Sequence, residues 1–80
     1  MRLDKYLKIS RLIKRRTIAN EACGAGRVMV NGKNAKASLE VKIGDVITIQ
    51  FGDKEVKAEV LEIAITMKKD EAKNLFRYID

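Results

Sequence analysis

The apolar positions in the first third of the chain recur at helical spacing and predict two short helices. Leu3 and Leu7 lie four residues apart within residues 2–9, which places them on one face of a helix. Residues 10–14 are expected to form a brief connection. A second helix is predicted from about residue 15 to residue 23, with an apolar face made by Ile18, Ala19, Ala22 and Cys23. Two glycines that can adopt positive φ are expected to end it, Gly24 and Gly26.

The period of the apolar pattern then changes from 3.6 residues to two. Residues 27–30 carry valine at every second position, which predicts a strand. The Asn31-Gly32 pair that follows is a strong hairpin signal, and a return strand is expected at residues 33–35. Residues 36–45 are expected to form a loop.

The second half of the chain predicts an antiparallel hairpin and a terminal helix. Residues 46–51 form the clearest strand, with one face made by Ile47, Ile49 and Phe51. After a Gly52-Asp53 turn, residues 55–63 are expected to return with an inward face made by Val56, Ala58 and Val60. A short C-terminal helix is predicted over residues 67–79, with the apolar positions Ala72, Leu75, Phe76 and Ile79. The predicted fold class is therefore α+β, with two N-terminal helices packed on a small, curled antiparallel sheet.

Length and composition predict one small domain over residues 1–80 and argue against several kinds of chemistry. The chain has one cysteine and no histidine, so it has neither an internal disulfide nor an imidazole for base catalysis or metal binding. Cys23 lies on a predicted apolar helix face and is expected to be a small core residue. We therefore expect a binding protein rather than an enzyme, with no cofactor and no metal. No apolar run approaches the length of a membrane span, so we expect a cytoplasmic protein with no membrane partner.

Charge is distributed unevenly along the chain, and this narrows the expected partner. The net charge is +6, but residues 1–36 alone carry ten Lys or Arg and two acids. That segment has a net charge of +8, whereas residues 37–80 have a net charge of −2. A segregated basic block indicates an anionic partner. Nucleic acid fits better than a membrane surface, because the basic segment has no large aromatic face.

Many of the basic residues surround the turn between the two predicted helices. The start of a helix favours a phosphate, whereas cations placed there oppose the helix dipole. Arginine also binds phosphate through two parallel hydrogen bonds and stacks on bases. The predicted RNA-binding residues are Arg2, Lys5, Lys8, Arg11, Lys14, Arg15, Arg16, Lys33 and Lys36. The alternative is an ordinary solvated face, and Tyr6 is expected either in the core or stacked on a base.

Residues 14–49 resemble the ribosomal-protein-S-four-type RNA-binding domain. The matching positions are Arg16, Ala19, Cys23, Gly26, Val28, Asn31, Gly32, Lys36, Ser38, Val41, Lys42, Gly44 and Asp45. The chain departs from the family pattern at three positions, with Arg15 for a hydroxyl residue, Cys23 for a larger aliphatic and Ile43 for proline. Residues 1–19 are more closely similar to the RqcP branch, whose members are free-standing bacterial relatives of heat-shock protein fifteen. The resemblance extends from residue 1 to about residue 63.

This resemblance implies a function as well as a fold. It implies binding to the large ribosomal subunit that still carries a nascent chain on tRNA, with contacts to ribosomal RNA and to that tRNA. It also implies a partner, an RqcH-like factor that adds a C-terminal alanine tail to the nascent chain. A monomer is expected. The alternatives are a rescue factor like heat-shock protein fifteen and the RNA-binding module of a pseudouridine synthase or RNA methyltransferase. The resemblance implies that heat-shock relatives carry a long basic C-terminal extension, so the end at Asp80 is expected to favour the tailing factor over that alternative. The start at Met1 and the predicted C-terminal helix are expected to argue against an enzyme fragment.

Overall fold

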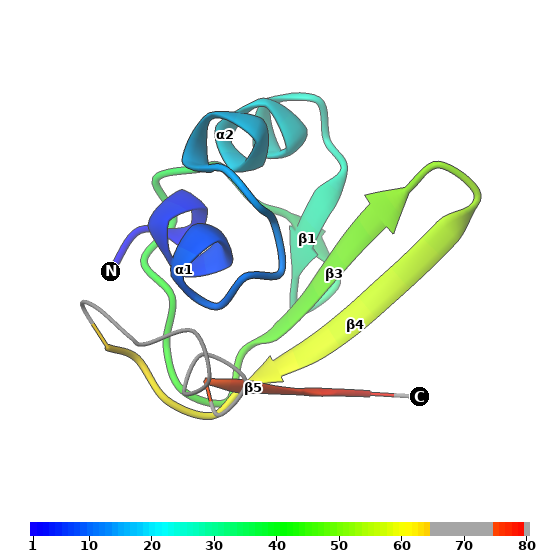
Figure 1. The fold of residues 1–80 in the computed structure, drawn as a ribbon. Helices are drawn as coiled ribbons and strands as arrows, with labels where there is room; N and C mark the ends of the chain where they lie inside the picture. The colour runs from blue at the N-terminus through cyan, green and yellow to red at the C-terminus, as the bar shows by residue number, and fades with distance from the viewer. Residues whose placement is uncertain (65–74, 80) are drawn as a thin grey trace.

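The computed structural model describes residues 1–64 and 75–79, where two helices precede a five-stranded sheet (Figure 1). The elements are α1 (Leu3–Ile9), α2 (Arg16–Gly24), β1 (Val28–Val30), β2 (Lys33–Asn34), β3 (Val46–Phe51), β4 (Lys54–Val60) and β5 (Phe76–Tyr78). The strand order is β2-β1-β3-β4-β5, and every neighbouring pair is antiparallel. The predicted α+β class and the two N-terminal helices are confirmed.

The helix α1 forms where its apolar spacing predicts, and the loop before β3 holds its first turn. Leu3 and Leu7 are fully buried. The backbone N–H of Leu3 donates to the Leu39 carbonyl at 2.8 Å, and that of Asp4 donates to the Ala37 carbonyl at 3.2 Å. The first N–H groups of a helix have no partner within it. The loop therefore satisfies these donors and fixes the position of the chain end beside the sheet.

The helix α2 ends at Gly24, and a glycine two residues later closes it. Gly26 has a φ of +76°. Its N–H donates to the Cys23 carbonyl at 3.1 Å, and the N–H of Arg27 donates to the Ala22 carbonyl at 2.9 Å. This pair of bonds is a Schellman motif, in which glycine adopts the left-handed conformation without steric cost.

The predicted apolar face of α2 holds for three of its four residues. Ala19 and Cys23 are buried, and Ala22 packs partly buried against the core. The prediction is wrong for Ile18, which is 48% exposed. The buried stripe consists of small side chains four residues apart, so α2 contacts the core through a narrow face. Ile18 lies about 100° around the helix from Ala19, at the rim of that contact.

Strands β3 and β4 share the predicted inward face, but two residues of β3 depart from the expected burial: Thr48, on the opposite face, is also buried, and Phe51 at the hairpin tip is not. Ile47 pairs with Ala58 and Ile49 pairs with Val56, so these side chains share one face of the sheet. Ile47 and Ile49 are buried, but Phe51 is 45% exposed. The hairpin tip extends away from the helices (Figure 1), and Phe51 therefore lies beyond the covered part of the sheet.

The Asn31-Gly32 turn joins β1 to β2 as predicted. Its two residues have φ values of 53° and 81°, both positive as a type I′ turn requires. The Asn31 side chain accepts a hydrogen bond from the Val46 N–H at 3.0 Å and donates one to Asp45 at 3.1 Å. The turn is thereby fastened to the start of β3.

The predicted C-terminal helix over residues 67–79 is wrong for the part that the structure describes. Phe76–Tyr78 form β5, which pairs with β4 at the edge of the sheet. The remainder of that prediction, residues 67–74, lies outside the described residues. Aromatic side chains favour strands. The edge of β4 also offers backbone hydrogen-bond partners to this segment, and the spacing of apolar residues within the segment does not show that such partners are nearby.

A buried tyrosine joins α1 to the segment before β5. Tyr6 is fully buried, and its hydroxyl donates to the Leu75 carbonyl at 2.7 Å. Burial raises the pKa of the Tyr6 hydroxyl, so the group stays protonated and keeps donating. Of the two expected roles for Tyr6, the structure supports the core role and leaves no ring face open to a base.

Candidate nucleic-acid interface

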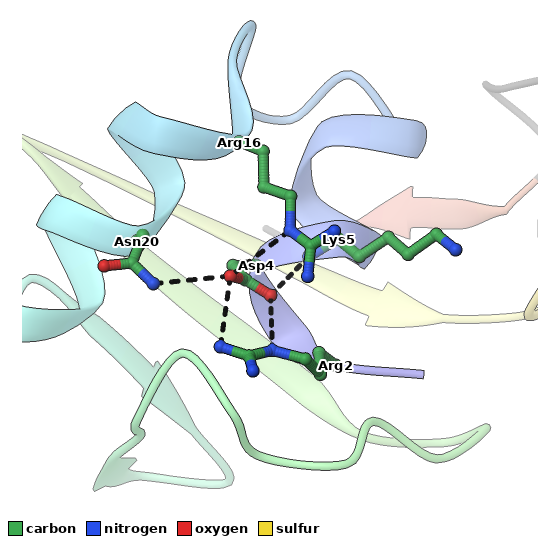
Figure 2. A network of polar contacts seen from close by, with 5 residues as sticks. All are labelled: Arg2, Asp4, Lys5, Arg16 and Asn20. Carbon is green, nitrogen blue, oxygen red and sulfur yellow. Dashed lines mark hydrogen bonds and ion pairs between the residues drawn. The ribbon is translucent and has the colours of Figure 1, made fainter.

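A buried carboxylate organises the basic residues around the two helices (Figure 2). Asp4 lies in the first turn of α1 and is 2% exposed. Its Oδ1 accepts a hydrogen bond from Arg2 Nε at 3.2 Å, and its Oδ2 forms an ion pair with Arg16 Nε at 3.4 Å. Asn20 Nδ2 donates to Oδ2 at 3.4 Å, and the Lys5 backbone N–H donates to Oδ1 at 2.8 Å. One carboxylate thus connects the residue before α1 with two residues on α2.

These contacts keep the Asp4 carboxylate charged. Burial alone would raise its pKa, but hydrogen bonds from Asn20, Arg2 and Arg16 and the positive charge of Arg16 together outweigh burial. The net effect lowers the pKa of Asp4 below its ordinary value. The side chain is therefore ionised at neutral pH. In the described ranges every buried side-chain nitrogen and oxygen has a hydrogen-bond partner, so the cluster is satisfied as it stands.

We expect acid to destabilise the protein through this carboxylate. Because the folded pKa of Asp4 is lowered, its contribution is present above the unfolded pKa of about 3.9 and is lost as the pH falls through the folded value. Thermal unfolding can be followed by circular dichroism from about pH 7 to about pH 2. The Tm should fall more steeply below about pH 4 in the wild type than in Asp4→Asn, which has no proton to take up there. Equal slopes in the two proteins would contradict this role.

Arg2 and Arg16 present the outer part of their guanidinium groups to solvent. Their side chains are 51% and 48% exposed, whereas that of Asp4 is 4% exposed. A guanidinium carries five N–H donors in a planar fork. Arg2 uses Nε and Nη2 toward Asp4, and Arg16 uses Nε. Donors therefore remain for a ligand. A fork that is already held in place loses less conformational freedom when it binds a phosphate.

The start of α2 is the second part of this surface. Its N-cap residue, Arg15, makes no side-chain hydrogen bond to the helix, and the first turn of α2 contains no acidic residue. The first N–H groups of α2 therefore lack a capping side chain, and the dipole faces cations instead of acids. Asp4 of α1 supplies the nearby negative charge through Arg16. Arg15 in place of a hydroxyl residue thus removes a cap and adds a cation, which makes this helix start favourable for an anion.

The nine residues predicted to bind RNA are accessible, but only two of them, Arg2 and Arg16, contact a common side chain. Eight of them are exposed, and Lys5 is half-buried. Arg2 and Arg16 meet at Asp4. The predicted residues between them in sequence, on α1 and on the connection to α2, are Lys5, Lys8, Arg11, Lys14 and Arg15.

Lys33 and Lys36 differ in their relation to this surface. Lys36 directly precedes Ala37, whose carbonyl accepts from the first turn of α1, so the Lys36 backbone lies beside the start of α1. Lys33 lies on the edge strand β2 and lines a groove that also contains Lys42, Glu40 and Asp45. The two acids balance the charges of the two lysines, so this groove has little net positive charge. The structure therefore favours Lys36 over Lys33 as an extension of the basic surface.

Asp4 and Asn20 belong to the site although the sequence pattern did not single them out as ligands or as supports. The contact between them joins residues sixteen positions apart on different helices. One local signal was available, because Arg16 and Asn20 are four residues apart and share one face of α2. This face of α2 forms part of the site only because α1 places the Asp4 carboxylate against it.

Three further observations concern the thiol, metal binding and membrane spans. Cys23 is buried as predicted, and burial, together with the charge of Asp4, raises the pKa of its thiol, which keeps it unreactive. Within residues 1–64 and 75–79, no group of three His, Cys, Asp or Glu could hold a metal ion. No helix in the described part of the chain is long and apolar enough to cross a membrane.

The fold and the basic site correspond to a known class of protein. The S4 domain family matches residues 1–47, and the chain belongs to this family. Curated proteins named RQC P-site tRNA stabilizing factor show which branch it is part of. The Bacillus subtilis protein is 55% identical over 76 residues, covering 95% of this chain and 88% of its own length. The Streptococcus pneumoniae protein is 48% identical over 79 residues, covering 99% and 90%. The predicted resemblance to this branch is confirmed.

A solved structure supports the same placement. The trimeric structure of Vibrio cholerae heat shock protein 15 is 35% identical in sequence and superimposes with a TM-score of 0.91. The match covers 99% of this chain and 81% of that one. The predicted relation to heat-shock protein fifteen therefore holds for the fold and the sequence.

Proposed function

We propose that the protein is an RNA-binding factor of bacterial ribosome-associated quality control. It binds ribosomal RNA and the tRNA that carries the nascent chain on stalled large ribosomal subunits. The names of its relatives, which are 48% and 55% identical, support a role at the P-site tRNA. The protein acts by binding rather than by catalysis, and it works in the cytoplasm, where these subunits are found.

The observation that carries this proposal is the pairing of Arg2 and Arg16 on one buried carboxylate. Asp4 contacts two half-exposed guanidinium groups from separate elements, and both are oriented by the one carboxylate. Two guanidinium groups in fixed orientations can each bind phosphate oxygens, or one can bind a phosphate while the other stacks on a base. Phosphate contacts of this kind set the position and orientation of a protein on nucleic acid. An ordinary solvated face needs no buried carboxylate to orient its exposed cations.

The same geometry supports the role of a partner-assisting factor. By holding the tRNA in place, the protein allows an RqcH-like factor to add C-terminal alanine residues to the nascent chain. Arg2, Asp4 and Arg16 all come from one chain, so the site is complete in a monomer.

A second candidate is a large-subunit rescue factor that works without tailing. The TM-score of 0.91 with Vibrio cholerae heat shock protein 15 favours it. The two functions differ in one measurable consequence. Alanine tailing by an RqcH-like factor depends on this protein in the first case and not in the second.

The test compares purified large subunits that carry peptidyl-tRNA with empty ones. We expect tighter binding to the former and an affinity that falls steeply with salt. If all nine predicted residues each neutralise a phosphate, the log–log slope is roughly −6, at about 0.7 per phosphate. If Arg2 and Arg16 alone do so, it is roughly −1.4. Equal binding to both kinds of subunit would contradict the proposed role at the tRNA, and a slope near zero would contradict the basic surface.

A further inference from the structure

A groove of about 750 Å³ lies between β2 and the segment that leads to β3. This volume falls in the range of ligand sites in proteins, roughly 300–1,000 Å³. Part of its lining is apolar, because Val30 and Ala35 are buried there and Leu39 packs partly buried against the core. The charged residues that line it are Lys33, Glu40, Lys42 and Asp45. The groove therefore offers a ligand both an apolar surface and charged groups.

The β2 side of the groove presents backbone groups that are not used within the sheet. The Ala35 N–H donates to the Val28 carbonyl at 3.1 Å, so these two residues form a hydrogen-bonded pair. Bonded and non-bonded pairs alternate along an antiparallel ladder, and the next pair, Met29 with Asn34, is therefore non-bonded. The N–H and C=O of Asn34 point away from β1, and they have no backbone partner among the described residues. Asn34 lines the groove.

The opposite side of the groove presents backbone groups in the same way. The Leu39 carbonyl accepts a hydrogen bond from the Leu3 N–H at 2.8 Å. The Val41 N–H donates to the Met1 carbonyl at 2.9 Å. These two bonds flank Glu40 and form an antiparallel bridge to the N-terminal residues. Because neighbouring residues of an extended chain turn their backbone groups to opposite sides, the N–H and C=O of Glu40 point away from the N-terminus, and Glu40 lines the groove.

We propose that this groove binds an extended peptide segment of a partner protein, which adds a strand between Asn34 and Glu40. Each of these residues turns one donor and one acceptor outward, and an edge with such groups is a template for another strand. The apolar side chains of the peptide contact the apolar lining of the groove. This inference goes beyond the proposed function, because a peptide binds here whether or not the arginines bind RNA.

The charges of the groove favour an acidic peptide over RNA. Two lysines and two acids line it, and its described lining contains no arginine or aromatic ring on which a base could stack. The Asp45 carboxylate is already engaged, since it accepts from Asn31 Nδ2 at 3.1 Å and from the Lys42 N–H at 2.9 Å. The ammonium groups of Lys33 and Lys42 form no ion pair within the described ranges. Acidic side chains that alternate with apolar ones can therefore pair with these lysines.

The test titrates two blocked heptapeptides, in which valine alternates with glutamate or with lysine, into the isotope-labelled full chain. We expect the glutamate peptide to shift the amide NMR signals of Asn34, Ala35 and Glu40, with a Kd of about 1 mM or tighter. At about ten times the Kd, amide hydrogen exchange of Asn34 and Glu40 should slow about tenfold. Methylating the backbone nitrogens of the valines should abolish these effects, because the added strand loses donors.

A charge reversal at Lys42 tests the expected preference for acids. Lys42→Glu should bind the glutamate peptide about fivefold more weakly and the lysine peptide more tightly, because one charge of the groove changes sign. Lys54→Glu makes the same change on β4, outside the groove, and should bind the glutamate peptide within about twofold of the wild type. Circular dichroism checks that both variants fold.

Several results would overturn this inference. No signal shift at about 10 mM glutamate peptide, or shifts only outside the groove, would exclude a peptide site here. Equal binding of the methylated peptide would exclude an added strand, and equal weakening in Lys42→Glu and Lys54→Glu would indicate a response to net charge alone. If a single-stranded oligouridylate shifts the groove signals and neither peptide does, the groove binds RNA instead. The proposed function is tested separately with ribosomal subunits, so failure of one leaves the other standing.

Discussion

Arg16→Ala is expected to abolish co-sedimentation with large ribosomal subunits while the fold stays intact. The Arg16 guanidinium is half-exposed at the start of α2, with Nε held by Asp4, so the remaining donors face the ligand. Removing one partner of a charged, hydrogen-bonded contact costs about 2–5 kcal/mol of binding free energy. That loss lowers the affinity at least about 30-fold. Sedimentation at near-physiological salt measures the binding, and far-UV circular dichroism measures the fold.

The structure indicates why this variant should fold. Without Arg16, the Asp4 carboxylate keeps Arg2, Asn20 and the Lys5 backbone N–H as partners, so no unpaired buried charge remains. Arg27→Ala is the matched control, with the same loss of charge and no contact to Asp4. Normal sedimentation of Arg16→Ala would exclude the assigned surface, and a loss in both variants would indicate a response to net charge alone. Arg2→Ala is expected to behave as Arg16→Ala does.

Asp4→Asn is expected to weaken RNA binding although it makes the protein more positive. The substitution keeps the size of the side chain but removes the charge that orients Arg2 and Arg16. An attraction based only on net charge would strengthen as the charge rises from +6. A site based on two fixed guanidinium groups should instead bind at least about tenfold more weakly, because both side chains must now be ordered by the ligand. Affinity is measured with large subunits at fixed salt.

The same variant should also be less stable, and this sets the conditions of the measurement. Asp4 is buried and accepts hydrogen bonds from charged groups, a contribution of about 2 kcal/mol. For a domain of this size, the Tm should fall by about 8–16 °C, so binding is measured well below that Tm. Asp53→Asn makes the same charge change at the exposed turn between β3 and β4 and should bind as the wild type or slightly better. Wild-type affinity in Asp4→Asn would show that the carboxylate does not position the arginines.

The local elements of this fold were predictable because their causes are local. The Asn31-Gly32 turn has the two positive φ values that its residue types favour, and Gly26 closes α2 for the same reason. The predicted Gly52-Asp53 turn likewise joins β3 to β4 and sets their register, in which Phe51 pairs with Lys54. The exposure of Ile18 and the strand at Phe76–Tyr78 were not predictable in this way. Both depend on the surface that the rest of the chain presents to these two segments. The spacing of residues within each segment carries no information about that surface.

The candidate site also has a part that residue order shows and a part that only packing decides. The sequence by itself determined that the first 36 residues are strongly basic and that arginines cluster around the turn between two helices, since charge and helical spacing are read directly from residue order. Only the tertiary structure decided which of these cations are held in place. Packing of α1 against α2 buries Asp4 between Arg2, Arg16 and Asn20, and the low exposure of that carboxylate makes its contacts directional. The left-handed backbone of Arg11 is likewise a consequence of where α1 must end for the chain to reach α2.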